Sequence, residues 1–354
     1  MRKFTLPRWA QILLGLLLTL LLGLLAWWIT GKVYKTNLPL GIPGKVLEYP
    51  LWAALVGLVG NALLRLTRQH ETVRAGIRTE LFLKVGLILL GAGINIKLLA
   101  TAAAGAILQA AIMITSVFFF SWWLAGKFKL DERLRAVMST AVSVCGVSAA
   151  IAAAGSVSAK KEQVTYVTTL VILVALPMMV LMPILANALG LSETVAGAWF
   201  GGNIDTTAAV IGAGTIYGET AQQIAGIIKN TQNAAIGLVA FLLAIYFASR
   251  EPASKGRPSA RLVWQRFPKF VLGFVLASIL YALGWIDGGK GTVVAAIKDW
   301  AFTLAFVSMG LELSITQMRQ MGWKPVIVFA LVTVFNTLLA LGVSYVIFTY
   351  LLPI

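Results

Sequence analysis

Residues 201–210 read GGNIDTTAAV and place two glycines, an asparagine, an aspartate and two threonines inside a chain of mostly apolar runs. A second polar group follows in IIKNTQNAAI, residues 227–236, where Lys229 stands in the middle of another apolar run. An ionisable residue within a membrane span is costly and usually has a function. The stretch therefore predicts a broken helix and a functional site inside a membrane protein.

The composition supports a membrane protein. The 354 residues are 59% hydrophobic and only 12% charged, with a mean hydropathy of +0.88, whereas a soluble domain has about one quarter charged residues. The net charge of +16 does not indicate nucleic acid, because most Lys and Arg stand between apolar runs. A single cysteine excludes an intramolecular disulfide, and a single histidine argues against a histidine-built metal site. No cofactor is expected.

The apolar runs predict an all-α polytopic membrane protein of about eleven transmembrane helices, two of them broken at glycine-rich points. The predicted spans are 10–30, 50–66, 81–96, 98–124, 134–156, 164–189, 194–214, 221–248, 267–286, 293–311 and 324–351. We interpret residues 1–354 as one transport domain. Its predicted parts are an N-terminal extra helix and linker (1–49), a first helix group (50–249), a cytoplasmic linker (250–266) and a second helix group (267–354).

The distribution of positive charge predicts the orientation. With eleven crossings, most of the 29 Lys and Arg fall on the side of the N-terminus. Cytoplasmic loops carry the excess of Lys and Arg, so we expect a cytoplasmic N-terminus and an external C-terminus. If run 194–214 entered and left by the same side, the basic linker 250–266 would be external. We therefore expect this run to cross the membrane as a broken helix.

Two runs share a pattern of glycine, a small hydroxyl residue and an alanine-rich stretch: SVCGVSAAIAAAG (143–155) and WFGGNIDTTAAVIGAG (199–214). Each predicts a helix that restarts inside the membrane, and backbone N–H groups at such a helix N-terminus attract anions. Two breaks that face each other would form an anion pocket. The alternative is that the small residues only allow close helix packing. The substrate-binding candidates are Gly146, Ser148, Gly202, Asn203, Thr206, Thr207, Lys229 and Asn233.

Asp205 is the candidate for ion coupling. It would carry a proton or bind a cation such as Na⁺, or it would only cap the helix that follows. Lys229 would pair with Asp205, attract an anionic substrate or exchange protons, and the structural alternative is an ion pair that joins two helices. Asn233 shares the helix face of Lys229.

Cys145, Asn95 and Glu312 are further candidates for the same cavity, and the alternative for Asn95 and Glu312 is a position at the membrane interface. Asn95 and Glu312 end the similar runs LILLGAGINI (87–96) and FVSMGLELSI (306–315), and such echoes suggest an inverted repeat. The chain shows no H-E-x-x-H motif, no Walker loop and no Cys-x-x-Cys pair. We therefore expect a protein that is not an enzyme.

Several segments resemble the bacterial YeiH family, formerly catalogued as UPF0324 and labelled as sulfate exporters. They are GLILLGAGINIKLL, CGVSAAIAAAG, GAWFGGNIDTTAAVIGAGTIYGETAQQIAGIIKNTQN, RFPKFVLGFVLASIL and MGLELSITQMRQMGWKPV. The resemblance runs from about residue 50 to the C-terminus. It implies a bacterial inner-membrane transporter built from inverted repeats with crossed broken helices. The chain departs from the family pattern at both polar groups. Asp205 stands where the family usually has histidine, and Thr206 where it has aspartate. Gln232 stands where the family has arginine after the retained Lys229.

These observations predict a secondary active transporter of a small anion, such as sulfate, another sulfur oxyanion or an organosulfonate, driven by a gradient of H⁺ or Na⁺. The expected partners are that anion, the coupling ion and membrane lipid. We expect no nucleic acid to bind. The sequence is compatible with a homodimer. The alternative function is a Na⁺/H⁺ or other cation/proton exchanger that uses an Asp205–Lys229 pair. A scaffold or channel is a third class.

Overall fold

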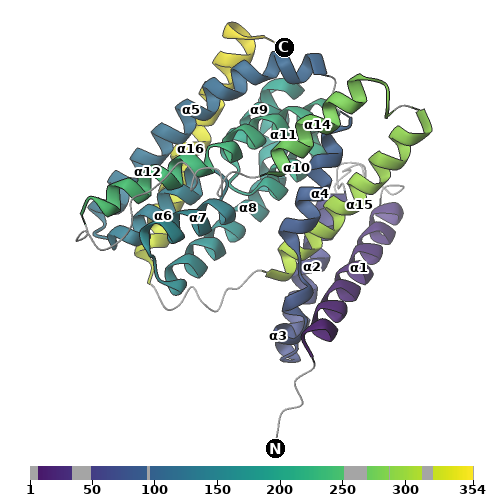
Figure 1. Cartoon of the computed structure of the whole chain (residues 1–354), viewed down its shortest axis with the longest axis horizontal. Coiled ribbons are helices and arrows are strands. Elements are labelled where there is room, and N and C mark those ends of the chain that lie inside the picture. The colour runs from purple at the N-terminus through teal and green to yellow at the C-terminus, as the bar shows by residue number, and fades with distance from the viewer. Residues whose placement is uncertain are drawn as a thin grey trace, which may run out of the picture. The chain divides into compact units, whose positions relative to one another are not determined.

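The protein is described by a computed structural model that covers residues 7–33, 49–93, 96–250, 269–286, 288–312 and 322–353. These residues form helices and no strands, as expected for an all-α membrane protein (Figure 1). Seven of the described helices are long and apolar enough to cross a membrane. The expected count of eleven spans is not confirmed.

The chain divides into two compact units, one of Met1–Gly93 with Gly273–Leu313 and one of Ile94–Leu272 with Ser314–Ile354. The predicted division into one domain with four parts stays a prediction. Unit 1 contains α1 (Arg8–Val33), α2 (Tyr49–Leu66), the short α3 (His70–Val73), a 3₁₀ turn (Arg74–Gly76), α4 (Thr79–Gly91), most of α14 (Phe270–Ala282) and α15 (Gly288–Glu312).

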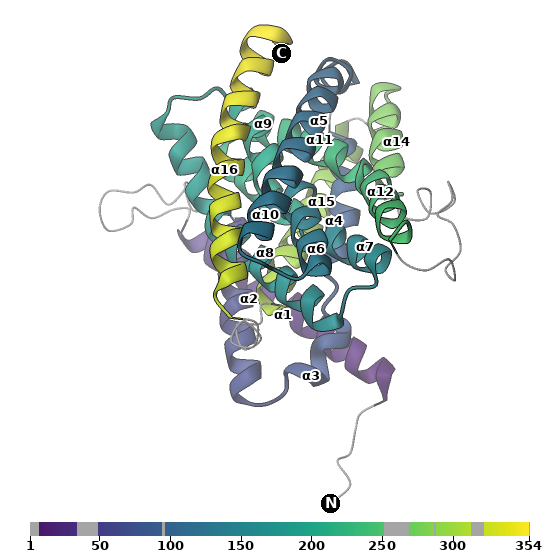
Figure 2. The ribbon, with the colours of Figure 1, turned by 90° about the vertical axis from the view of Figure 1, so that its left-hand side faces the viewer.

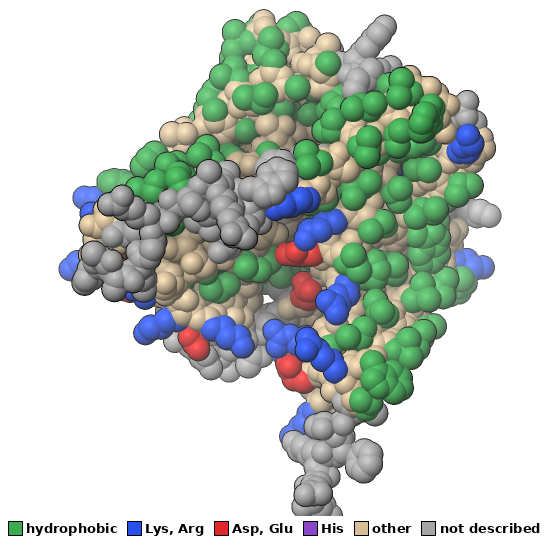
Figure 3. Space-filling view, in the orientation of Figure 1, with side chains coloured by type: hydrophobic (Ala, Val, Ile, Leu, Met, Phe, Trp, Pro, Cys, Tyr) green, Lys and Arg blue, Asp and Glu red, His purple; other side chains and the backbone are tan. Residues whose placement is uncertain are grey.

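Helix α15 is the centre of unit 1, where it packs against α2 and α4. Helix α1 packs against α2 and α15, and its Trp27 ring stacks on Trp300 with centroids 5.6 Å apart. The rest of α1 exposes leucines such as Leu13, Leu17 and Leu21. The space-filling view shows the resulting apolar surface (Figure 3). Exposed leucines on a helix of this hydropathy are suited to lipid contact.

Unit 2 contains α5 (Ile96–Lys127), α6 (Glu132–Ser143), α7 (Val147–Val157), α8 (Lys161–Ala188), α9 (Glu193–Asn203), α10 (Thr207–Tyr217), α11 (Glu219–Ala234), α12 (Ile236–Ala248) and α16 (Lys324–Val346) with a final π-helical turn (Ile347–Leu351). Helix α16 packs along α5 and α9 (Figure 2). Helices α11 and α12 follow each other with only Ala235 between them and together have the length and hydropathy of one span.

Helices α6 and α7 form a hairpin that returns to the face it entered. The Arg133 guanidinium, near the start of α6, donates to the Ser158 carbonyl just after α7 at 3.0 Å. Gln163 at the start of α8 donates to Asp131 at 2.7 Å. The two helices have 12 and 11 residues, so each is about 17 Å long. That length is roughly half of the hydrocarbon core.

Helices α9 and α10 form a second hairpin of the same kind. The Tyr217 hydroxyl at the end of α10 donates to the Leu191 carbonyl just before α9. The Thr220 amide, at the start of α11, donates to Glu193 at 2.8 Å. Runs 134–156 and 194–214 are therefore re-entrant hairpins, which corrects the prediction that each crosses the membrane.

The two hairpins enter unit 2 from opposite ends. The 28-residue α8 starts beside the open end of the first hairpin and ends beside the open end of the second. We call the first end the basic face, with residues 127–135, 158–163 and 250, and the other end the opposite face, with residues 188–193 and 217–220. Arg250, just beyond α12, pairs with Glu132 at 2.8 Å and so lies at the basic face.

Candidate functional site

The tips of the two hairpins meet. Gly146 at the first tip has φ +68°, and a Cβ atom there would lie 3.1 Å from the Asp205 carbonyl oxygen at the second tip and 2.5 Å from Val171 Cγ1. A positive φ and so close an approach both favour glycine. The two predicted breaks therefore lie at the tips of two hairpins, and these tips are in contact.

Each tip presents the N-terminus of a half-length helix. Gly146 precedes α7 and, as a glycine, has no side chain that could cap this helix. Helix α10 is capped by Thr206, whose hydroxyl accepts from the Ala209 amide at 3.3 Å. The cap is therefore Thr206 and not Asp205, so capping does not explain the acid. Two helix N-termini at one place create a positive region without a formal charge.

Lys229 connects the two tips from α11. Its ammonium group donates to the Val144 carbonyl of the first tip at 2.8 Å and to the Gln232 side chain at 3.0 Å. Gln232 in turn donates to the Gly202 carbonyl near the second tip at 3.4 Å. An ammonium group has three donors, and the described residues provide hydrogen-bond partners for two. The third donor has no hydrogen-bond partner among the described residues.

Asp205 is a buried acid at the second tip. Its exposed fraction is 3%, and no described residue donates a hydrogen bond to its carboxylate. It interacts electrostatically with Lys229, but among the described residues the two form no ion pair within 4.0 Å. A buried carboxylate without a direct partner is costly. That cost falls when the group takes up a proton or meets a cation.

Thr207 and Asn233 form a polar pair beside Asp205. The Asn233 amide donates to the Thr207 hydroxyl at 3.4 Å, and its buried Oδ1 atom has no hydrogen-bond partner in the described part of the chain. This oxygen is an unused acceptor next to the first residue of α10. Asn203 is bonded elsewhere, because its Oδ1 accepts from Thr337 at 3.0 Å and its carbonyl from Asn336 at 2.9 Å.

The tips are enclosed by protein. The predicted site residues with exposed fractions of 1–7% are Cys145, Asn203, Asp205, Thr206, Thr207, Lys229 and Asn233. Val147 and Ser148, in the first turn of α7, are partly exposed. A ligand that reaches the tips from outside therefore needs a movement of the protein, and the first turn of α7 is the least covered part of the site.

The remaining predicted residues lie in different places. Gly202 belongs to the last turn of α9, where a Cβ atom would collide with the Gln109 side chain, so it serves close packing rather than an unwound backbone. Cys145 is buried at the first tip beside Ile236. Glu312 ends α15 in unit 1 and stays a prediction, while Asn95 lies outside the described residues.

The sequence analysis did not predict that Gln232 and the Val144 carbonyl would be the hydrogen-bond partners of Lys229. Gln232 stands three residues after Lys229, on the same helix face, and that spacing was the available signal. The Val144 carbonyl carries no side-chain signal at all. Within the described residues, no group of three His, Cys, Asp or Glu side chains is arranged to hold a metal ion.

The fold and the site define a polytopic membrane protein in which two opposed re-entrant hairpins meet at a buried acid and a buried base. The family model described as conserved hypothetical protein 698 matches residues 14–343. The chain belongs to this family.

Three relatives show the range of similarity. The chain is 36% identical over 344 residues to a UPF0324 membrane protein of Rhodopirellula baltica, which covers 93% of the chain and 61% of that protein. A UPF0324 membrane protein of Nitratidesulfovibrio vulgaris is 35% identical, covering 85% of the chain and 55% of that protein. One of Bacillus cereus is 28% identical, covering 88% and 87%.

The chain thus spans somewhat more than half the length of the first two relatives. No solved structure matches the chain. The relatives carry the name of a membrane protein, and together with the apolar helices this makes the chain a multi-pass membrane protein.

Proposed function

We propose that the protein is a secondary active transporter of a small anion, such as sulfate, another sulfur oxyanion or an organosulfonate. The observation that carries the proposal is the meeting of the hairpin tips at Gly146 and Asp205, where the N-termini of α7 and α10 lie at the two tips. Non-helical backbone at membrane depth is tolerated only inside protein or along a water-filled cavity. Such breaks are typical of substrate sites in transporters.

In this proposal the anion binds to the two helix N-termini, with hydroxyl and amide contacts from Ser148, Thr207 and Asn233. Lys229 balances the negative charge with its third N–H donor, while its other two donors hold the tips together. The burial of these residues supports alternating access, because the tips must open to one face at a time.

Asp205 supplies the coupling in this proposal. Its carboxylate lies at the same tip as the N-terminus of α10 and would repel a second anion there. Uptake of a proton, or of Na⁺, removes that repulsion. The anion and the coupling ion would then bind together and move in the same direction. The site thereby links the gradient of one ion to the movement of the other.

A second function is favoured by one specific observation. The Lys229 ammonium lies against the Val144 carbonyl and, through Gln232, reaches the Gly202 carbonyl. These oxygens are at helix C-termini, which attract cations. The protein would then be a cation/proton exchanger in which Na⁺ or H⁺ competes with Lys229 for Asp205, and no anion would be needed.

Thermal unfolding of the purified chain against a panel of anions and cations, at two pH values, distinguishes these functions. A ligand that binds only the folded state raises the free energy of unfolding by about 2.7 kcal/mol at one hundred times its Kd. For the anion transporter we expect one anion to stabilise the protein. The effect should be lost in Lys229→Gln and kept in Lys127→Gln, a matched charge change at the surface. Stabilisation by Na⁺ or by pH alone, with no response to any anion, would favour the exchanger.

A further inference from the structure

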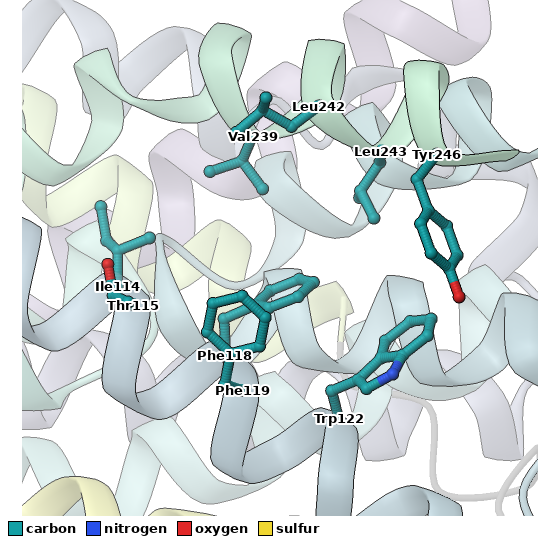
Figure 4. Close-up of a pocket in the computed structure, with 9 residues that line it drawn as sticks. All are labelled: Ile114, Thr115, Phe118, Phe119, Trp122, Val239, Leu242, Leu243 and Tyr246. Carbon is teal, nitrogen blue, oxygen red and sulfur yellow. The ribbon is translucent and has the colours of Figure 1, made fainter. Parts of the chain in front are cut away.

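An apolar groove runs along the outside of unit 2 between α5 and α12 (Figure 4). Its volume is about 290 Å³, near the lower end of small-molecule sites. Side chains from both helices point into it, and several, such as Phe119 and Leu242, are more than half exposed. The lining residues are Ile114, Thr115, Phe118, Phe119, Trp122, Val239, Leu242, Leu243 and Tyr246.

The end of the groove at the basic face carries two guanidinium groups. Arg135 lies over the Trp122 ring and Arg250 over the Tyr246 ring, each 4.4 Å from the ring centroid. Arg250 is neutralised by Glu132. Arg135 is not, because within the described chain no carboxylate lies within 4.0 Å of it. Its Nη2 atom donates to the Trp122 carbonyl at 2.9 Å, which leaves Nη1 and the second hydrogen of Nη2 for a ligand.

The surroundings of Arg135 are positive as well. The turn of residues 127–135 together with Arg250 holds five Lys and Arg against two acids. An apolar groove that ends at an unneutralised guanidinium matches a molecule with a hydrocarbon chain and an anionic head. Basic pockets between transmembrane helices bind anionic head groups, and guanidinium binds phosphate through paired hydrogen bonds.

We propose that this groove is a binding site for an anionic phospholipid. One acyl chain lies between α5 and α12, and the phosphate pairs with the Arg135 guanidinium at the basic face. The site lies outside the hairpin tips and does not depend on which ion or anion the protein carries.

A second copy of the chain is the competing occupant, and its charges disfavour it. In a two-fold symmetric dimer the same patch faces itself. Arg135, the guanidinium that no carboxylate of the described chain neutralises, would then lie against Arg135 of the other copy at the same membrane depth. The phospholipid instead brings the opposite charge, so we prefer it.

The inner end of the groove touches the hairpin. Ile114 and Val239 pack against a buried cluster that includes Val144 and Cys145 of the first tip. An acyl chain in the groove covers these side chains on the lipid side. The bound lipid is therefore expected to stabilise the α6–α7 hairpin as well as to anchor the basic face.

The test compares phosphatidylglycerol with phosphatidylcholine of identical acyl chains, added to the delipidated full chain in neutral detergent. Bound lipid is counted by native mass spectrometry and stability by thermal unfolding. We expect phosphatidylglycerol to bind more tightly and to raise the unfolding temperature. Arg135→Gln should weaken its binding roughly fivefold, the effect of one basic side chain near an anionic lipid. Lys129→Gln, the same charge change on an exposed turn, should leave the preference unchanged.

A second variant tests the groove itself. Val239→Trp fills the inner end, so it should reduce binding of both lipids without abolishing the preference for phosphatidylglycerol. Equal binding of the two lipids, or equal effects of Arg135→Gln and Lys129→Gln, would overturn the proposal. A dimer that Val239→Trp dissociates, with bound lipid unchanged, would assign the groove to a second copy instead.

Discussion

Gly146 is the residue on which the meeting of the hairpin tips depends most. Gly146→Ala adds a Cβ atom 2.5 Å from Val171 Cγ1, at a backbone with φ +68°. Backbone strain costs about 1–2 kcal/mol and overpacking typically about 1–3 kcal/mol. We therefore expect a loss of about 2–5 kcal/mol, the sum of the two costs, measured by denaturant or thermal unfolding in detergent.

Gly190→Ala is the matched control for this prediction. Gly190 has φ +62° but nothing within 4 Å of its Cβ position, so only the backbone strain applies there. The loss should be clearly smaller than for Gly146→Ala. Equal losses would mean that Val171 of α8 and the Asp205 carbonyl do not approach Gly146 as closely as the structure shows.

Asp205 is the residue on which coupling depends. Asp205→Asn keeps the side-chain volume and removes the charge, so the anion no longer competes with a carboxylate. In proteoliposomes, we expect the variant to exchange anion across the membrane while losing the accumulation that a pH or Na⁺ gradient drives. Wild-type protein in the same vesicles without a gradient is the control. Full gradient-driven accumulation by the variant would exclude Asp205 as the coupling group.

At the scale of elements, Asp131 holds the first hairpin at the basic face. It caps α6 by accepting from the Arg133 and Leu134 amides, each at 3.1 Å, and it accepts from Gln163 of α8. Burial raises the pKa of Asp131, but these hydrogen bonds and the charge of Arg133 outweigh burial, so its pKa lies below the usual 3.8. The charged form is thus the one that stabilises the fold.

Asp131→Ala should therefore destabilise the protein near neutral pH by about 1–2 kcal/mol, the usual cost of losing a helix cap. Because the folded pKa is lowered, the stabilisation is present above the unfolded pKa and is lost as the pH falls through the folded value. The difference between variant and wild type should shrink below about pH 4. Unfolding at several pH values checks this, and a constant difference would contradict the role of the charge.

The helices and breaks were largely predictable from the sequence, whereas the direction of the chain after each break was not. Hydropathy marks run 134–156 as apolar, and its 23 or so residues are as long as one span or as two half-length helices. Gly146 signals a break but not a reversal. The distribution of Lys and Arg could not reveal that the chain turns back after each break. Two re-entrant hairpins place residue 250 on the same side of the membrane as two crossing helices would.

Part of the candidate site was likewise predictable from the sequence, and part was not. Polar residues inside apolar runs revealed Asp205 and Lys229, since such residues are costly unless they have a role. Whether Lys229 contacts Asp205 depends on which backbone carbonyl groups at the tips lack a hydrogen-bond donor. The amino-acid sequence does not specify those carbonyl groups directly. Lys229 therefore came out bonded to Val144 and Gln232, with no direct ion pair to Asp205.

At the scale of the whole molecule, the hairpins change the distribution of charge across the membrane. Lys160 and Lys161 stand between Ser158 and Gln163, which bond to Arg133 and Asp131, so both lysines now lie on the basic face. Residues 188–193 and 217–220 on the opposite face contain no Lys or Arg. Cytoplasmic loops carry the positive excess. We therefore expect the basic face to be cytoplasmic.

Labelling of single introduced cysteines with a membrane-impermeant reagent tests both the hairpin and the orientation. The native Cys145 is buried and should not react in the folded protein. Lys129→Cys and Lys161→Cys should react only after the cells are permeabilised, whereas Leu189→Cys should react in intact cells. Reaction of Lys129→Cys and Lys161→Cys from opposite sides would mean that α6 and α7 cross the membrane. If both instead react in intact cells, the hairpin stands and the orientation is reversed.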